Sequence, residues 1–284
     1  MPIELSTPIE VISQDDFHAI DHVMMRHAFD IHNQFGRLLN ESVYKTELTD
    51  RCIAHGFTVQ REILIRMRHQ IFVKDYFLDL LLCGSTIIEA KTVQVLTEAN
   101  RGQGLNYLLL AGTHHGSLVN FRPASVKREF LSTQLTLQKR RQFTTTETHW
   151  PADDDHARLR DQTISLAADA GLGLDVQLYR EGIAALIGQA NRRLVPVLSG
   201  SKTIGNHEMY LLREDTGLAV TALSDLADYR LHLQRLLSTT SLAAMAWVNV
   251  RLGNIHFEEL RRQNHWGNRI QVMILSKIPH HQSP

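Results

Sequence analysis

The chain has 284 residues, a length that favours two domains of moderate size over one. Its 43% hydrophobic and 21% charged residues are typical of a globular protein with a sizeable core and exclude disorder throughout. Thirty basic residues balance thirty acidic ones. If the protein binds nucleic acid, its basic residues must therefore be clustered in one region, or the binding must be weak and transient as in an enzyme.

Membrane and secreted classes are also disfavoured. No apolar stretch approaches the ~20 residues that cross a bilayer, and the acidic start of the chain is unlike a signal peptide. The two cysteines, Cys52 and Cys83, are typical of a reduced protein rather than of a disulfide scaffold. We therefore expect a cytoplasmic protein with no membrane partner.

The first part of the chain predicts helices that flank a mixed sheet. Apolar residues recur at helical spacing from residue 16 to 32, and a second helix ends at Gly56. Strand-like patterns follow, with a turn at Gly84 and one further helix before the last strands. The expected helices are 16–32, 40–55 and 94–111, and the expected strands are 58–67, 71–82, 86–93, 116–121 and 126–131.

The second part of the chain repeats this rhythm after a polar segment. Residues 132–161 are rich in threonine and charge, which indicates a linker between two lobes. We therefore expect domains at 1–131 and 162–284, joined by this linker. The second lobe is expected to contain helices at 173–189 and 231–237 and strands at 195–198, 208–213, 217–223 and 245–250.

Residues 107–121 align without a gap on residues 236–250, and Asn120 then meets Asn249. This match indicates an internal duplication with a pseudo-two-fold arrangement, an intramolecular pseudo-dimer. The alternative is generic patterning shared by two α/β lobes. With Ile87–Lys91 on Ala219–Leu223, the expected counterparts of Asp79, Glu89 and Lys91 are Leu211, Thr221 and Leu223, which cannot assemble a metal site.

Two carboxylates interrupt apolar strands in the first lobe. Asp79 and Glu89 lie in neighbouring predicted strands around the Gly84 turn, and burying them together is costly unless a cation compensates. Mg²⁺ or Mn²⁺ suits two carboxylates, because such ions take oxygen ligands and keep several waters. Lys91 follows Glu89 on the same strand face, where its amine suits a water-positioning or charge-stabilising role. A structural ion pair between Glu89 and Lys91 is the alternative.

Other side chains are expected beside this group. Gln103 and Tyr107 lie one helical turn apart on the next helix, and Glu41 shares an inward helical stripe upstream. Helix-start stabilisation is the alternative for Glu41. Arg122 and Lys127, with the basic run at 139–141, are candidates for a phosphate-binding patch, although a solvated surface explains such charges equally well.

The segments GRLLNESVYKTEL, FLDLLL, IIEAK, QGLNYLLLAG and GSLVNF together resemble the GxxExxR protein family, a branch of the PD-(D/E)xK nuclease superfamily. The resemblance covers about residues 17–131, and the sequence has Leu38 and Tyr44 where that family's pattern has Gly and Arg. It implies a restriction-endonuclease-like αβββαβ fold. It also implies Asp79 and Glu89 as metal ligands, Lys91 as water-positioning base, Glu41 as a further acid and Gln103 as an orienting group.

The expected function is metal-dependent hydrolysis of phosphodiester bonds, with nucleic acid, DNA before RNA, as substrate and Mg²⁺ or Mn²⁺ as cofactor. Tyr107, Arg122 and Lys127 are the expected substrate-binding residues. The alternative is a non-catalytic module that kept the nuclease fold to bind nucleic acid or protein. The neutral charge balance favours this alternative, and the intact acidic group with Lys91 opposes it.

Overall fold

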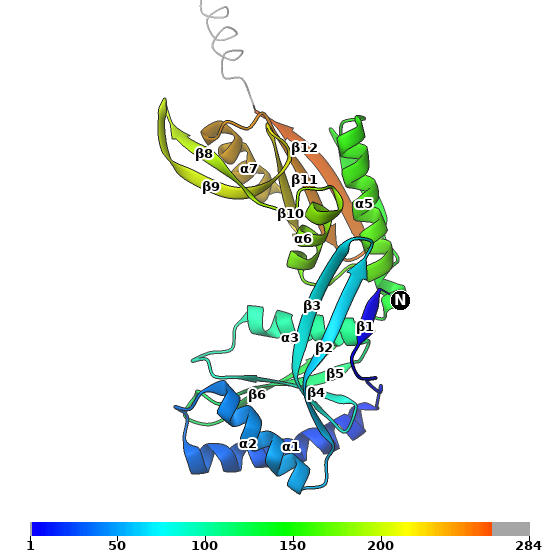
Figure 1. The fold of residues 1–284 in the computed structure, drawn as a ribbon, viewed down its shortest axis with the longest axis vertical. Helices are drawn as coiled ribbons and strands as arrows, with labels where there is room; N and C mark the ends of the chain where they lie inside the picture. Colours follow the sequence, from blue (N-terminus) through cyan, green and yellow to red (C-terminus); the bar gives the residue numbers. More distant parts are fainter. Residues whose placement is uncertain (1, 263–284) are drawn as a thin grey trace, which may run out of the picture.

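The computed structural model describes residues 2–262 as two lobes, each built on a six-stranded sheet (Figure 1). The expected mixed α/β class is confirmed, because both sheets contain parallel and antiparallel pairs and both are flanked by helices. Within the described residues, no helix combines the length and apolar character that crossing a membrane requires.

The first sheet keeps its strands in chain order from one edge to the other. The pairs are antiparallel except the fourth with the fifth, which are parallel because a helix crosses over between them. The strands are β1 (Ile3–Leu5), β2 (Val59–His69), β3 (Phe72–Leu82), β4 (Thr86–Lys91), β5 (His115–Asn120) and β6 (Lys127–Ser132).

Helices cover both faces of this sheet. Two helices enclose a core with Leu80, Ile88 and Val119 on one face, and the third packs Leu108 against Ile87 and its neighbours on the other face. The third helix begins with a capping box at Thr97, which explains why it starts there. These helices are α1 (Gln14–Phe35), α2 (Glu41–Ala54) and α3 (Glu98–Ala111).

The second sheet has the order β7-β12-β11-β10-β9-β8. Its strands are β7 (Thr144–Thr148), β8 (Arg193–Ser199), β9 (Lys202–Arg213), β10 (Thr216–Thr221), β11 (Ala244–Arg251) and β12 (Asn254–Arg261). The helices of this half are α4 (Leu137–Arg140), α5 (Asp154–Ala170), α6 (Val176–Leu186) and α7 (Ala227–Thr239). From α5 onward, two helices, three strands, a helix and two strands follow in the same order as in the first lobe from α1.

The second helix of each lobe is fixed by the same tyrosine bonds. The Tyr44 hydroxyl donates to the Gly36 carbonyl at 2.7 Å and accepts from the Leu39 amide at 3.3 Å. Tyr179 makes both bonds, at 2.5 Å and 3.3 Å, with residues eight and five positions before it. Because the spacing and the bonds coincide, α6 corresponds to α2.

An asparagine fixes the end of the parallel strand pair in each lobe. The Asn120 side chain accepts from the Val93 amide at 3.1 Å and donates to the Val93 carbonyl at 2.7 Å. Asn249 makes the same two bonds with Leu223, at 2.7 Å and 3.0 Å. The predicted match of Asn120 with Asn249 therefore coincides with a repeated structural role.

The strand register corrects the expected counterparts in the second lobe. In the first lobe Lys91 pairs with Asn120, and in the second Thr221 pairs with Asn249. The loop between β4 and α3 differs in length from the loop between β10 and α7. An alignment that is anchored on the helices therefore assigns the wrong partners to the strand residues. The corrected pairs are Lys91 with Thr221, Glu89 with Ala219 and Asp79 with Met209, in place of Leu223, Thr221 and Leu211.

The segment 132–161, expected as a polar linker, contains α4, β7 and the first turns of α5. β7 pairs in parallel with β12 and forms the edge of the second sheet, where Thr144–Glu147 are exposed. Polar threonines suit such an edge because its outer side faces solvent. The composition that indicated a linker is therefore that of an edge strand and of an amphipathic helix.

The two lobes share a continuous hydrophobic core. The β2–β3 hairpin extends from the first lobe toward α5 and α6 (Figure 1), and Phe72 near its tip packs against Gly182 of α6. An ion pair of 2.7 Å joins Lys74 Nζ to Glu181 Oε2 beside this contact. The Asn106 side chain also accepts from the Asp175 amide at 2.9 Å. These contacts fix the start of α6 against α3.

Candidate active site

Asp79 and Glu89 lie opposite each other on β3 and β4, as the sequence predicted. Leu80 pairs with Ile88, which places the two acids side by side, and both are buried. Glu89 Oε1 accepts the Asp79 amide at 3.2 Å, and Asp79 Oδ2 accepts the Ala90 amide at 2.9 Å. Backbone hydrogen bonds therefore hold one oxygen of each carboxylate.

Lys91 lies beside this pair. Its Nζ is 3.4 Å from Glu89 Oε2, and its side chain is largely buried. The period-2 pattern of the strand correctly predicted this juxtaposition of Glu89 and Lys91. The same contact is also the ion pair between Glu89 and Lys91 that the sequence left as the alternative.

The structure adds two residues that the sequence did not indicate, Lys45 of α2 and Glu62 of β2. Lys45 Nζ lies 2.8 Å from Asp79 Oδ1, 3.1 Å from Glu62 Oε1 and 3.9 Å from Glu41 Oε1. Glu62 has a φ of 51°, a left-handed conformation that is costly for a residue with a side chain. One lysine thus joins three carboxylates from α2, β2 and β3.

Glu41, Glu62, Asp79 and Glu89 form the acidic group of the site. Burial and mutual repulsion raise the pKa of two of these acids. Burial, followed by the charge of Asp79, raises the pKa of Glu89 to about 8. The same two causes raise the pKa of Glu41, which also accepts the Thr92 amide. Burial alone would lower the pKa of Lys45, but its bonds to Asp79 and Glu62 raise it. The group is therefore short of positive charge.

The donor chemistry fits a divalent cation. Asp79 and Glu89 supply hard oxygen donors side by side, and their mutual repulsion, which adds to the effect of burial on the pKa of Glu89, favours a cation between them. Two carboxylates suffice for Mg²⁺ or Mn²⁺ when water completes the coordination. Over residues 2–262, no group of three or more His, Cys, Asp or Glu side chains is arranged as a protein-only metal cage. The fit is therefore to a hydrated ion.

Gln103 and Tyr107 of α3 border a cavity of about 480 Å³. The Gln103 amide donates to the Tyr107 hydroxyl at 2.9 Å, as their helical spacing allows. Tyr107 lies close enough to Glu89 and Asp79 for their charges to raise its pKa, after the larger effect of burial. Asp175 of the second lobe also lines the cavity, so both lobes shape the space near the acidic group.

The expected basic patch is not assembled as one surface. Arg122 donates to the Thr92 carbonyl at 3.3 Å, beside the end of β4, and Lys127 is exposed on β6 in register with Asn120. Arg140, by contrast, is buried and donates to backbone carbonyls of both lobes. The run at 139–141 is thus partly structural, because the buried Arg140 guanidinium donates hydrogen bonds to carbonyls at the ends of helices.

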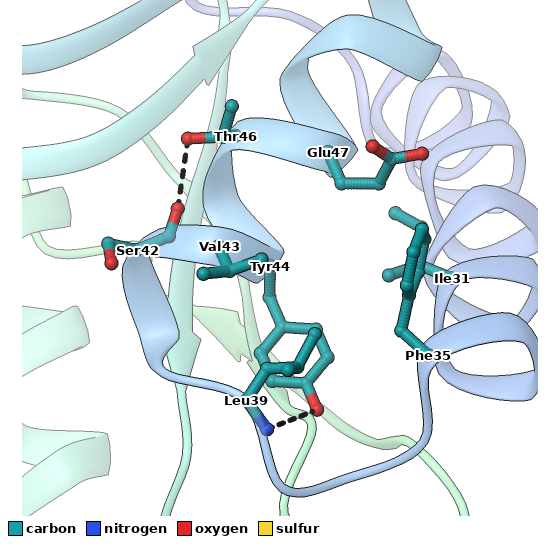
Figure 2. A pocket seen from close by; sticks show the side chains of 8 residues that line it. All are labelled: Ile31, Phe35, Leu39, Ser42, Val43, Tyr44, Thr46 and Glu47. Carbon is teal, nitrogen blue, oxygen red and sulfur yellow. Dashed lines mark hydrogen bonds between the residues drawn. The ribbon is translucent and has the colours of Figure 1, made fainter.

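A separate cavity of about 310 Å³ lies between α1 and α2. Figure 2 shows Phe35 and Ile31 on one side, with Tyr44 and Leu39 joined by a hydrogen bond on the other. The one carboxylate in its lining, Glu47, is bound to Arg51 at 2.7 Å. This cavity is mostly apolar and is distinct from the acidic group.

Residues 18–132 match the family described as the PD-(D/E)XK nuclease superfamily. The matched segment is the first lobe, from within α1 to the end of β6, and nucleases of this superfamily generally use divalent metals. Comparison with curated proteins and with solved structures gave no match. The predicted superfamily is confirmed.

Proposed function

We propose that the first lobe is a metal-dependent nuclease that hydrolyses phosphodiester bonds in nucleic acid, with DNA as the first substrate to test. The buried pair of Asp79 and Glu89, with Lys91 beside it in a lobe of this superfamily, is the observation that carries the proposal. The segment 36–48 supports a place in the GxxExxR branch.

Asp79 and Glu89 would hold Mg²⁺ or Mn²⁺. When bound, such an ion polarises a phosphoryl oxygen and makes a bound water more acidic. Asp79 and Glu89 keep their carboxylates in place through the backbone amides of Ala90 and Asp79. This pre-ordering lowers the cost of arranging the site during reaction.

Lys91 is the proposed water-positioning residue. Its ammonium hydrogen-bonds Glu89, and it can orient the attacking oxygen and offset the negative charge that develops on the phosphate. Glu41 would act as a further acid, since burial and the charge of Asp79 raise its pKa. Gln103 would orient the substrate, with Tyr107, Arg122 and Lys127 as contacts to it.

A cleavage assay tests this proposal. Full-length protein is incubated with single- and double-stranded DNA and RNA in Mn²⁺, alongside Asp79→Asn and Lys91→Ala. Loss of cleavage by a factor of about 10² or more in both variants supports the enzyme. Lys127→Ala should mainly weaken substrate binding. Equal activity in wild type and both site variants would identify a contaminating nuclease.

A non-catalytic module that binds nucleic acid or protein is the second candidate. Lys45 favours it, because its amine already neutralises part of the acidic group at 2.8 Å from Asp79. Tight nucleic-acid binding without cleavage, unchanged by divalent metal and by Asp79→Asn, is the result expected of that module. The assay above distinguishes the two candidates on the same preparations.

A further inference from the structure

The second lobe contains a cavity of about 240 Å³ at the position that corresponds to the acidic group of the first lobe. Its lining includes Met209 and Ala219, the register counterparts of Asp79 and Glu89. Leu236, the counterpart of Tyr107, lines it from α7. The second lobe therefore has a cavity where the first lobe has the Asp79 and Glu89 carboxylates, and it has no acid at either of those two positions.

The charge of this hollow is the reverse of that in the first lobe. Arg180 follows Tyr179 as Lys45 follows Tyr44, so a cation is kept at this position of the helix. Arg180 donates to the Val220 carbonyl at 3.1 Å, which fixes its guanidinium against the strand that forms the floor. Asp79, which contacts Lys45, is replaced by Met209, and Glu89 is replaced by Ala219, so this cavity lacks both acids of the pair.

Two further basic side chains line the rim, Arg192 and His207. Arg192 lies over the Tyr210 ring, 5.4 Å from its centroid, a stacking that orients the guanidinium. Glu208 is the acid in the lining, and it approaches Arg192 at 3.7 Å from a well-exposed position. Such an exposed pair is weak, so Arg192 remains able to bind another anion.

We propose that this cavity binds the phosphate group of a nucleotide or of a nucleic-acid strand. Guanidinium groups present several planar donors that match phosphate oxygens, and two of them line this cavity together with an imidazole. An apolar floor of Leu218, Ala219 and Val220 lowers the competition from water. The second lobe thereby has a site for anions where the first has a site for a cation.

Binding to full-length protein tests this site. Calorimetry without divalent metal uses inorganic phosphate, deoxyadenosine monophosphate and a short single-stranded oligodeoxynucleotide as probes. Arg192→Ala/His207→Ala should weaken the binding of a phosphate-bearing probe by about tenfold or more, because a guanidinium and an imidazole that can donate to the phosphate are removed. Arg235→Ala removes an equal charge from α7 outside the cavity lining and should leave the affinity unchanged.

Arg180→Lys keeps the charge but loses the planar fork, so an intermediate loss is expected. Measurement in Lys91→Ala as well separates this site from the nuclease proposal, because the cavity should bind equally in an inactive enzyme. Binding by the monophosphate assigns the site to free nucleotides, and binding by the strand alone assigns it to nucleic acid. Equal affinities in the double variant and in Arg235→Ala, or no binding of any probe by wild type, would overturn the proposal.

Discussion

Lys45 Nζ lies 2.8 Å from Asp79 Oδ1, so an amine from α2 occupies one oxygen of the proposed metal ligand. The same amine contacts Glu62 and Glu41. A cation that binds Asp79 and Glu89 must therefore compete with a charge already supplied by the protein. The position of Lys45 couples metal binding to the packing of α2 against the sheet.

Lys45→Met should raise metal affinity and lower the stability of the metal-free protein. Removing the like charge favours a divalent cation, and we expect Mn²⁺ to bind about tenfold more tightly. Three acids lose their shared partner, which should cost about 1–3 kcal/mol of unfolding free energy. Calorimetric Mn²⁺ titration and urea unfolding measure the two effects.

Lys74→Met is the matched control, since it removes a lysine that pairs with Glu181 away from the acidic group. It should leave the Mn²⁺ affinity unchanged. If Lys45→Met and Lys74→Met bind Mn²⁺ equally, Lys45 does not compete with the metal.

The stability of the metal-free protein should fall as pH rises toward 8. Burial and Asp79 raise the pKa of Glu89 from 4.5 to about 8, so between these values the folded state holds a proton that the unfolded state has lost. The free energy of unfolding therefore decreases with rising pH across this window. Glu89→Gln should flatten the dependence and stabilise the metal-free protein by about 1–3 kcal/mol at pH 8.

Urea unfolding at several pH values in the presence of a chelator gives this dependence. Glu98→Gln, at an exposed acid in the first turn of α3, should keep the wild-type slope. Added Mn²⁺ should restore stability at pH 8 in wild type but not in Glu89→Gln. Parallel pH curves for wild type and Glu89→Gln would contradict the buried, protonated state of Glu89.

The equivalent tyrosines of the two lobes allow a matched comparison. Tyr44→Phe and Tyr179→Phe each remove a hydroxyl that bonds a carbonyl and an amide of the preceding loop. Each should cost about 1–2 kcal/mol, measured by thermal unfolding. Only Tyr44→Phe should also reduce cleavage, because its loop leads directly to Glu41. Equal activity in the two variants would remove Glu41 from the proposed site.

The sequence predicted the order of elements in the first lobe from α1 onward, because the periodic apolar patterns there are strong, but it did not predict the short strand β1. It did not predict α5 or β12 as elements of the second lobe. The α5 stripe of Leu159, Leu166 and Ala170 is buried, yet the acidic start of that helix resembles a linker. β12 carries Glu258 and Glu259 as buried acids bound to Arg230 and His156, which hides its strand pattern.

For the site, Asp79, Glu89 and Lys91 could be predicted because one hairpin and one strand place them together. Lys45 is separated from Asp79 by 34 residues, and its approach depends on how α2 packs on the sheet. The one sequence signal for Lys45 was its i, i+4 spacing from Glu41. This spacing predicts that the two residues are neighbours on a helix surface, and it does not predict a contact with a residue on a strand. Asp175 near Gln103 depends on the packing of the lobes, which local patterns do not specify.

Arg140 connects the ends of two helices in different lobes. Its Nη2 donates to the Leu109 carbonyl in α3 and its Nη1 to the Ala170 carbonyl in α5, each at 3.0 Å, and the residue is 1% exposed. A cation at two helix C-termini is stabilising, and a buried carbonyl without a donor is costly. Arg140→Met should therefore lower the unfolding free energy by about 3 kcal/mol or more.

Differential scanning calorimetry provides the measurement. Wild type should unfold in one transition because the core is shared between the lobes. Arg140→Met should lower the midpoint and separate the unfolding of the lobes into two transitions. Arg141→Met is the control, since the exposed Arg141 guanidinium donates to the Asp169 carbonyl and to no other acceptor among the described residues. If wild type already unfolds in two transitions, the lobes unfold independently. The Arg140 hydrogen bonds would then be a consequence of the packing between the lobes and would not stabilise that packing.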